Sequence, residues 1–156
     1  MAVEIERKFL VDPNRLPPLG VGERFVQGYL SADPEVRFRI VGRRTILCVK
    51  KHLAQGRRIE LEFPRDDLTA EEMGDLSALA LWPPLVKVRH RVPHGGLVWE
   101  VDVYEDANAG LVTAEVEIPA VGHPVEFPPW VDPAREVTGS ATYANISLTR
   151  RPYTTW

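Results

Sequence analysis

Hydrophobic and polar residues alternate along most of this chain with a period of two. The alternation is clear in eight short segments, at residues 3–11, 25–30, 36–41, 45–51, 58–63, 86–92, 97–104 and 112–118. Because successive side chains of a β-strand point to opposite faces, this period predicts eight strands, each with one apolar face. Glycine-containing turns at residues 41–44, 54–56 and 94–96 connect successive segments, which predicts a mostly antiparallel sheet.

One helix is predicted after the fifth strand. Thr69 can cap its first turn, Glu72 completes a capping box, and Leu68 and Met73 are spaced as a hydrophobic staple. The prolines at residues 83–84 should stop it. The proline-rich C-terminal part, from residue 123 onward, is harder to assign and predicts only a short helix near residues 132–136.

Composition changes this picture little. The 156 residues fit a single domain, 1–156, and 44% hydrophobic with 26% charged residues is typical of a globular protein. A formal net charge of −3 argues against a nucleic-acid partner, and no apolar run approaches the roughly 18 residues of a membrane span. Cys48 is the single cysteine, which excludes an intrachain disulfide and suits the cytoplasm.

Charged residues gather on one face of the predicted strands, and they are sorted by strand. The third, fourth and sixth strands are basic on this face, whereas the seventh and eighth are acidic. The basic set is Lys8, Arg37, Arg39, Lys50, Arg58, Lys87, Arg89 and Arg91, and the acidic set is Glu4, Glu6, Glu60, Glu62, Glu100, Asp102, Glu115 and Glu117. A solvated face has no reason for such sorting, since like charges on neighbouring strands repel.

Two arrangements explain an amphipathic sheet. The polar face can simply be solvated. Alternatively, the helix and the proline-rich segment cover an outer apolar face, and the charges line the interior. The sorting of charge favours the second, so we expect a mainly β (α+β) fold: an eight-stranded antiparallel closed β-barrel with a charged interior and helices packed outside.

The residue types on this face indicate the chemistry. Clustered carboxylates suit hard divalent cations such as Mg²⁺ or Mn²⁺, and arginine forks with lysine point charges suit an oligophosphate. The four histidines show no ligand spacing, and no G-x-x-x-x-G-K-[ST] loop is present. The combination predicts a metal-dependent site for a polyphosphate.

The opening Glu4-x-Glu6-x-Lys8 resembles the E-x-E-x-K signature of the CYTH, or triphosphate tunnel metalloenzyme, superfamily, and most closely its short stand-alone bacterial members. The similarity extends along almost the whole chain. It includes residues 27–30, 37–39, Lys50, 58–62, 87–89, 99–102, 110–111, 114–117, 136–139, Tyr143 and Asn145. One departure is Cys48, where the family pattern leads us to expect threonine; its side chain should face the tunnel as a small filler.

The resemblance implies a role for each matched residue. The implied metal ligands are Glu4, Glu6, Glu115 and Glu117, with Glu62 and Asp102 as further ligands or water-holders. The implied phosphate ligands are Lys8, Arg37, Arg39, Lys50, Arg58, Lys87 and Arg89. The implied catalytic set is Glu4, Glu6, Lys8, Lys87, Glu115 and Glu117.

Our hypothesis is that two ions act, one bridging the triphosphate and one activating the water that attacks its terminal phosphorus. The leading substrate is inorganic tripolyphosphate, because no residue that can be placed beside the phosphate set forms an aromatic pocket. An organic triphosphate hydrolase or adenylate cyclase, acting on ATP or thiamine triphosphate, and a non-catalytic polyphosphate or nucleotide binding module are the alternatives. The sequence is compatible with a homodimer.

Overall fold

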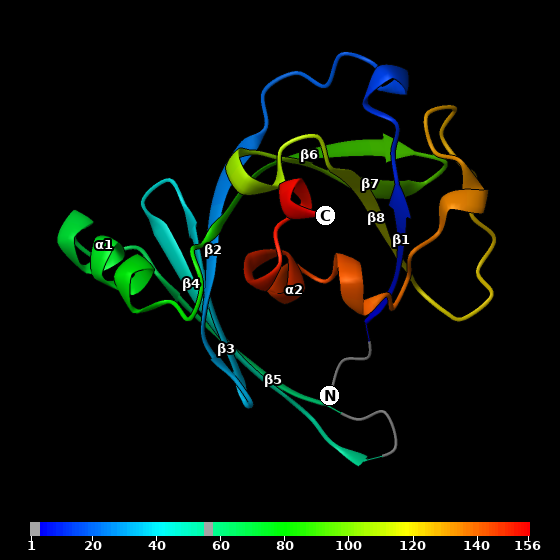
Figure 1. Ribbon diagram of the computed structural model, residues 1–156. Helices are drawn as coiled ribbons and strands as arrows, with labels where there is room; N and C mark the ends of the chain where they lie inside the picture. Colours follow the sequence, from blue (N-terminus) through cyan, green and yellow to red (C-terminus); the bar gives the residue numbers. More distant parts are fainter. Residues whose placement is uncertain (1–3, 55–57) are drawn as a thin grey trace.

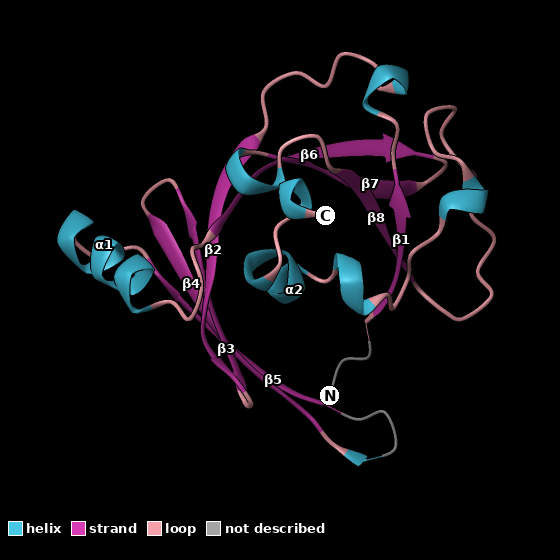
Figure 2. Ribbon diagram, viewed as in Figure 1, coloured by secondary structure: helices cyan, strands magenta, loops and turns pink. Residues whose placement is uncertain are grey.

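Eight strands form one antiparallel sheet (Figures 1 and 2). The structure is a computed structural model that describes residues 4–54 and 58–156. The strands are β1 (Ile5–Leu10), β2 (Glu23–Ala32), β3 (Glu35–Val41), β4 (Arg44–His52), β5 (Arg58–Arg65), β6 (Leu85–His94), β7 (Leu97–Tyr104) and β8 (Val112–Ile118), in the order β1-β8-β7-β6-β2-β3-β4-β5. All eight predicted strands are confirmed. The predicted turn at 54–56 lies largely outside the described residues.

The sheet curls around a central space (Figure 1), but its two end strands do not meet. Within the described residues β1 pairs only with β8 and β5 only with β4, so a closed barrel is not confirmed. The free edge of β1 is partly occupied by the C-terminal segment. The amide of Val137 donates to the carbonyl of Lys8 at 2.8 Å, and the amide of Lys8 donates to Thr138 Oγ1 at 2.9 Å. These backbone groups are therefore not available to β5.

The main apolar core lies on the outer face of the sheet, as the charge sorting predicted. Phe9 on β1 and Trp99 on β7 are completely buried, and their rings pack at 5.8 Å between centroids. Phe127 and Trp130, from the proline-rich segment, cover them at 5.4 Å from Phe9 and 6.2 Å from Trp99. Apolar burial on this side leaves the charged faces of the strands turned toward the interior.

Helix α1 (Ala70–Leu79) begins where it was predicted. The amide of Glu72 donates to Thr69 Oγ1, and the Glu72 carboxylate accepts from the Thr69 amide, which completes the capping box. The helix nevertheless buries none of its residues. The expectation that it covers the outer apolar face is wrong for β5, because the chain beyond α1 is drawn toward β2, where the Leu81 amide donates to the Tyr29 carbonyl at 2.9 Å.

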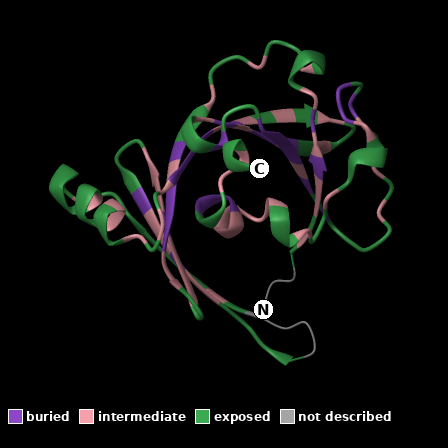
Figure 3. Cartoon of the chain, viewed as in Figure 1, coloured by how far each residue is buried: buried purple, intermediate pink, exposed green. Residues whose placement is uncertain are grey.

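The outer face of β5 consequently stays open (Figure 3). Ile59, Leu61 and Phe63 are 45%, 51% and 51% exposed. Buried residues are concentrated instead in β2, β6, β7 and β8.

The sequence did not predict α2 (Asn145–Arg150), which lies within the curve of the sheet (Figure 1). Its Leu148 is completely buried against Leu85 and Tyr104. The short helix predicted in the C-terminal segment is a 3-10 turn. The 3-10 turns are η1 (Pro13–Arg15), η3 (Asp106–Asn108), η4 (Pro133–Arg135), η5 (Ala141–Tyr143) and η6 (Tyr153–Thr155). In the described part of the chain, no helix has the length and apolarity needed to cross a bilayer.

The close contact between Gly28 on β2 and the ring of Phe38 on β3 generates a stability prediction. A Cβ at position 28 would lie 2.4 Å from Phe38 Cζ, and Phe38 is completely buried. Gly28→Ala should therefore lower the free energy of unfolding, measured by urea denaturation, by about 1–3 kcal/mol through overpacking. Gly74→Ala is the control: a Cβ there meets nothing within 4 Å, and α1 should gain about 0.5–1 kcal/mol. Equal urea midpoints for Gly28→Ala and the wild type would contradict this packing.

Candidate active site

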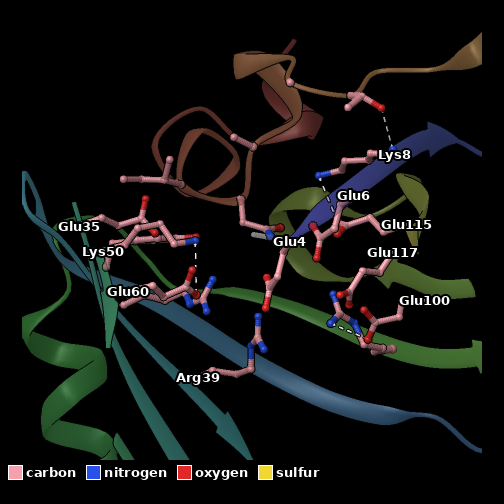
Figure 4. Close-up of a pocket in the computed structure, with 18 of the residues that line it drawn as sticks. Glu4, Glu6, Lys8, Glu35, Arg39, Lys50, Glu60, Glu100, Glu115 and Glu117 are labelled. Atoms are coloured by element: carbon pink, nitrogen blue, oxygen red, sulfur yellow. Dashed lines mark hydrogen bonds and ion pairs between the residues drawn. The ribbon is translucent and has the colours of Figure 1, made fainter. Parts of the chain in front are cut away.

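The charged interior of the sheet encloses a cavity of about 500 Å³ (Figure 4). All eight strands and the C-terminal segment contribute side chains to this cavity. Its lining is Glu4, Glu6, Lys8, Tyr29, Glu35, Arg37, Arg39, Lys50, Glu60, Glu62, Arg89, Glu100, Glu115, Glu117, Thr138, Gly139, Ala144, Asn145 and Ile146. Charged groups thus dominate the cavity.

One wall is acidic and is built by β1, β8 and β7. Antiparallel pairing sets Glu6 directly opposite Glu117, and Glu100 directly opposite Glu115. The pKa of Glu6 is raised to about 7, first by lost hydration, then by the charge of Glu115 and a hydrogen bond to it, and then by Glu4 and Glu100. The carboxylates of this wall therefore face one another, and the nearby basic side chains do not fully balance their negative charge.

Lys8 joins this acidic wall to the C-terminal segment. Its Nζ lies 3.7 Å from Glu115 Oε1 and donates to the Tyr143 carbonyl at 2.7 Å. Lys8 shares the face of Glu4 and Glu6, as the two-residue period predicted. Its ammonium is consequently placed at the boundary between the carboxylates and the rest of the cavity.

The opposite wall carries the basic side chains of β3 and β4, with Glu35, Glu60 and Glu62 beside them. Arg37 and Arg39 project from β3, and Lys50 projects from β4, where its Nζ lies 3.8 Å from Glu60 Oε1. The pKa of Arg39 is lowered to about 10, first by burial and then by the positive charges of Arg37 and Arg89. Cations that repel one another in this way favour a polyanion between them.

Arg89 of the lining and two residues behind it form a buried ion-pair network. Asp102 on β7 and Lys87 on β6 are completely buried, and Lys87 Nζ donates to Asp102 Oδ2 at 2.7 Å. Arg89 donates to the same carboxylate through Nε and Nη2, both at 2.8 Å. Burial lowers the pKa of Lys87 to about 8, against the attraction of Asp102. Burial raises the pKa of Asp102, but its two cationic partners outweigh burial and hold it far below its ordinary value, so the carboxylate stays ionised.

The structure brings most of the predicted site residues to the cavity. Those in the lining are Glu4, Glu6, Lys8, Arg37, Arg39, Lys50, Glu62, Arg89, Glu115 and Glu117. Lys87 and Asp102 are not part of the lining, because they pair with each other beneath it. Arg58 begins β5, and its side chain lies outside the described part of the structure.

Several lining residues had been given no role from the sequence. Glu35 is the first residue of β3 and lies opposite Lys50, and the two-residue period would have placed it beside Arg37 had the strand been started one residue earlier. Asn145 belongs to the unpredicted α2, and its Oδ1 accepts from Tyr104 Oη at 2.6 Å. Local sequence carries no signal for a contact of that kind between distant segments.

Gln27 and Tyr29 support the basic wall from β2. The side-chain amide of Gln27 donates to Tyr29 Oη at 2.9 Å, and its oxygen accepts from Arg39 Nε at 3.1 Å. Burial is the first cause of the raised pKa of Tyr29, which is about 12, so the phenol keeps its proton. Because Gln27 is completely buried, it fixes the direction of Arg39 without taking part in the lining.

Two groups of side chains could hold a cation. Ligand atoms of Cys48, Glu60 and Glu62 lie within 4.8 Å of one another on β4 and β5, beside the basic Lys50. Cys48 Sγ is 3.7 Å from Glu60 Oε1, and burial raises the pKa of its thiol. The second group is the acidic wall of β1 and β8. Its donors are all carboxylate oxygens, and the register sets Glu6 directly opposite Glu117, an arrangement that a divalent cation would stabilise.

The comparisons with known proteins agree with this geometry. The chain is 35% identical over 155 residues to a protein of Acetivibrio thermocellus named an inorganic triphosphatase, covering 98% of this chain and 97% of that relative. The crystal structure of the inorganic triphosphatase NE1496 matches it with a TM-score of 0.70 and 27% identity, over 96% of this chain and 95% of that one.

A second solved structure, the PH1012 protein from Pyrococcus horikoshii, shares the fold alone, with a TM-score of 0.52 and 20% identity over 76% of this chain and 80% of that one. No model of a protein family matches the chain. Identity to a relative over nearly the full length of both proteins, together with the two-signed cavity and the motifs that line it, decides the family. The chain belongs to the CYTH, or triphosphate tunnel metalloenzyme, superfamily.

Proposed function

We propose that this protein is a metal-dependent triphosphatase that hydrolyses the terminal phosphoanhydride of inorganic tripolyphosphate. The observation that carries the proposal is that one cavity sets the clustered carboxylates of β1, β7 and β8 opposite the basic side chains of β3 and β4 (Figure 4). A site that only binds a polyanion would need only the basic side chains. Carboxylates facing those cations are needed when a metal ion must be bound beside the anion. The name of the Acetivibrio thermocellus relative supports the same activity.

Glu4, Glu6, Glu115 and Glu117 would hold the metal, with Glu62 as a further ligand on the opposite wall. Oxygen donors without histidine suit Mg²⁺ or Mn²⁺, and two ions are part of the proposal. When bound, the metal supplies positive charge beside the phosphates and lowers the pKa of a coordinated water. Burial and then the neighbouring carboxylates raise the pKa of Glu6, and a bound cation would offset the second of these causes.

The basic side chains would bind and orient the phosphate chain. Arg37, Arg39, Lys50 and Arg89 offer donors from three strands, and Lys8 adds an ammonium next to the acidic wall. Charge that develops on the transferred and leaving phosphates would be stabilised by these donors. Gln27 already holds Arg39 in place, and Asp102 holds Arg89. Arg58 is included on the family resemblance.

An inorganic substrate is favoured by the lining itself. Tyr29 is the one aromatic side chain among the described lining residues, and Ala144 and Ile146 are the apolar ones. A nucleobase or thiazole ring would find no stacking surface there. Hydrolysis or cyclisation of an organic triphosphate such as ATP or thiamine triphosphate is the second candidate, and a non-catalytic binding module is the third.

The proposal has a structural and a cellular part as well. We propose that the chain acts as one domain, that its eight strands form a closed barrel open as a tunnel, and that the enzyme works in the cytoplasm without a nucleic-acid or membrane partner. A homodimer is compatible with this function.

A substrate panel tests the activity directly. Tripolyphosphate, pyrophosphate, ATP and thiamine triphosphate are assayed for phosphate release with Mg²⁺ and with Mn²⁺. We expect tripolyphosphate to give the highest kcat/KM. Preferential conversion of ATP to cyclic AMP would refute an inorganic triphosphatase, and tight tripolyphosphate binding without turnover would leave only a binding module.

Removing the β8 carboxylates should separate catalysis from binding. We expect Glu115→Gln with Glu117→Gln to lower kcat for tripolyphosphate about 100-fold or more, since the metal site is lost, while metal-free binding of tripolyphosphate measured by calorimetry is kept. Glu71→Gln with Asp75→Asn, two exposed acids on α1, removes the same charge far from the cavity and should leave kcat unchanged. Metal-dependent turnover that survives in the β8 variant would contradict the assignment.

The raised pKa of Glu6 predicts how stability depends on pH. Between its ordinary value of 4.5 and about 7, the folded protein binds more protons than the unfolded chain, so stability should fall as pH rises through this window. In EDTA, Glu6→Gln should raise the urea midpoint at pH 8 and not at pH 4. Mn²⁺ should raise the wild-type midpoint more at pH 8 than at pH 5, because the carboxylates are then ionised. A wild-type midpoint that does not respond to Mn²⁺ at pH 8 would count against a cation site on this wall.

A further inference from the structure

Asp102 is placed unlike the carboxylates of the acidic wall. It is completely buried and does not reach the cavity. Its Oδ1 accepts from Arg89 Nε at 2.8 Å, and its Oδ2 accepts from Arg89 Nη2 at 2.8 Å and from Lys87 Nζ at 2.7 Å. Both oxygens are therefore occupied by cationic donors, and the carboxylate has no side open to a metal ion.

Arg89 is held by more than this fork. Its Nη1 donates to Glu100 Oε2 at 3.0 Å, and its Cζ lies 5.2 Å from the centroid of the buried Phe25 ring. Two carboxylates thus fix the guanidinium in its plane, and an aromatic ring supports one of its faces. Arg89 is only 8% exposed, yet it belongs to the lining of the cavity.

The charge of the network is also informative. Lys87 and Arg89 carry two positive charges in the floor of the cavity, which the carboxylates of Asp102 and Glu100 balance, and Lys87 Nζ lies 5.9 Å from the centre of the Phe25 ring. A buried cation without a partner is costly. Lys87 and Asp102 stabilise each other, and what they leave for the substrate is one oriented guanidinium.

We propose that Asp102, together with Lys87, is a positioning element that orients Arg89 toward the phosphate chain, and that Asp102 is not a metal ligand. The inference rests on the proposed function for its substrate. It revises the role that the family resemblance implied for both residues. Lys87 acts by neutralising the Asp102 carboxylate on the side away from the cavity. Of the three residues in the network, Arg89 is the one that contacts phosphate.

The sign of the effect on anion binding separates the two roles. Asp102→Asn removes one negative charge. If Asp102 were a metal ligand, metal-free affinity for tripolyphosphate would stay the same or increase, because repulsion falls. If Asp102 orients Arg89, that affinity, measured by calorimetry in EDTA, should fall about 10-fold or more, the size expected when a supporting hydrogen-bond partner is lost. An unchanged or tighter complex would overturn the proposal.

Glu115→Gln is the matched control, since it removes the same charge from the acidic wall. It should leave metal-free binding unchanged or tighter and raise the Mn²⁺ concentration needed for half-maximal activity. Asp102→Asn should raise KM and leave that Mn²⁺ requirement within about 2-fold of the wild type. A shift in Mn²⁺ requirement equal to that of Glu115→Gln would overturn the proposal.

Arg89→Lys keeps the charge but cannot donate the two parallel hydrogen bonds of the fork to Asp102. It should lose about as much metal-free affinity as Asp102→Asn, and the double variant should lose little more, because both changes remove one interaction. Additive losses would contradict action through Arg89. This variant also carries the test if Asp102→Asn fails to fold, which thermal unfolding will show.

A readout without substrate keeps this inference separate from the proposed function. In the wild type, the Arg89 Nε–H should give a nuclear magnetic resonance signal that is protected from exchange with water, because it is buried in the fork. Asp102→Asn should abolish that protection, whereas Glu115→Gln should not. Protection that persists in Asp102→Asn would overturn the positioning role, and failure of the wild type to cleave tripolyphosphate would refute only the proposed function.

Discussion

A sheet that turns its charged face inward gathers those charges around one cavity and must balance them there, and the rest of this structure follows from that requirement. The balance is achieved in two ways. In the floor, Asp102 is paired so fully with Lys87 and Arg89 that all three tolerate burial. Along the walls, Glu6 and Arg39 keep like-charged neighbours, and their pKa values shift toward the neutral forms. The charges of the floor are balanced by one another, whereas the charges of the walls would be balanced by a bound metal ion and a bound phosphate chain.

Turning the charges inward also explains why the apolar core lies outside. The outer faces of β1, β7 and β8 need a cover, and Phe127 and Trp130 of the proline-rich segment provide it. The same segment then crosses the edge of β1 and continues into α2, which packs Leu148 inside the curve of the sheet. One stretch of chain therefore contributes to the core, the edge and the cavity.

Sequence periodicity predicted the faces of the strands well and the depth of the residues poorly. Glu100 and Asp102 have the same parity on β7, as do Arg89 and Arg91 on β6, yet Asp102 is completely buried and Arg91 is exposed. A period of two assigns a side chain to a face. It does not say how the sheet curves or what closes over each position. The contacts of Asn145 and Tyr143 with β7 and β1 span such long separations that no local pattern could predict them.

The exposed outer face of β5 affects whether copies of this protein associate with one another. Within the described residues β5 has one hydrogen-bonded neighbour, and a free strand edge with apolar side chains is the kind of surface on which chains assemble into larger sheets. Pro64 has no amide hydrogen and interrupts that edge. In an antiparallel pair of two such strands, Glu60 and Glu62 would be brought against glutamates of the second copy. The carboxylates that face the cavity thus also discourage self-assembly, so solubility and substrate binding depend in part on the same charges.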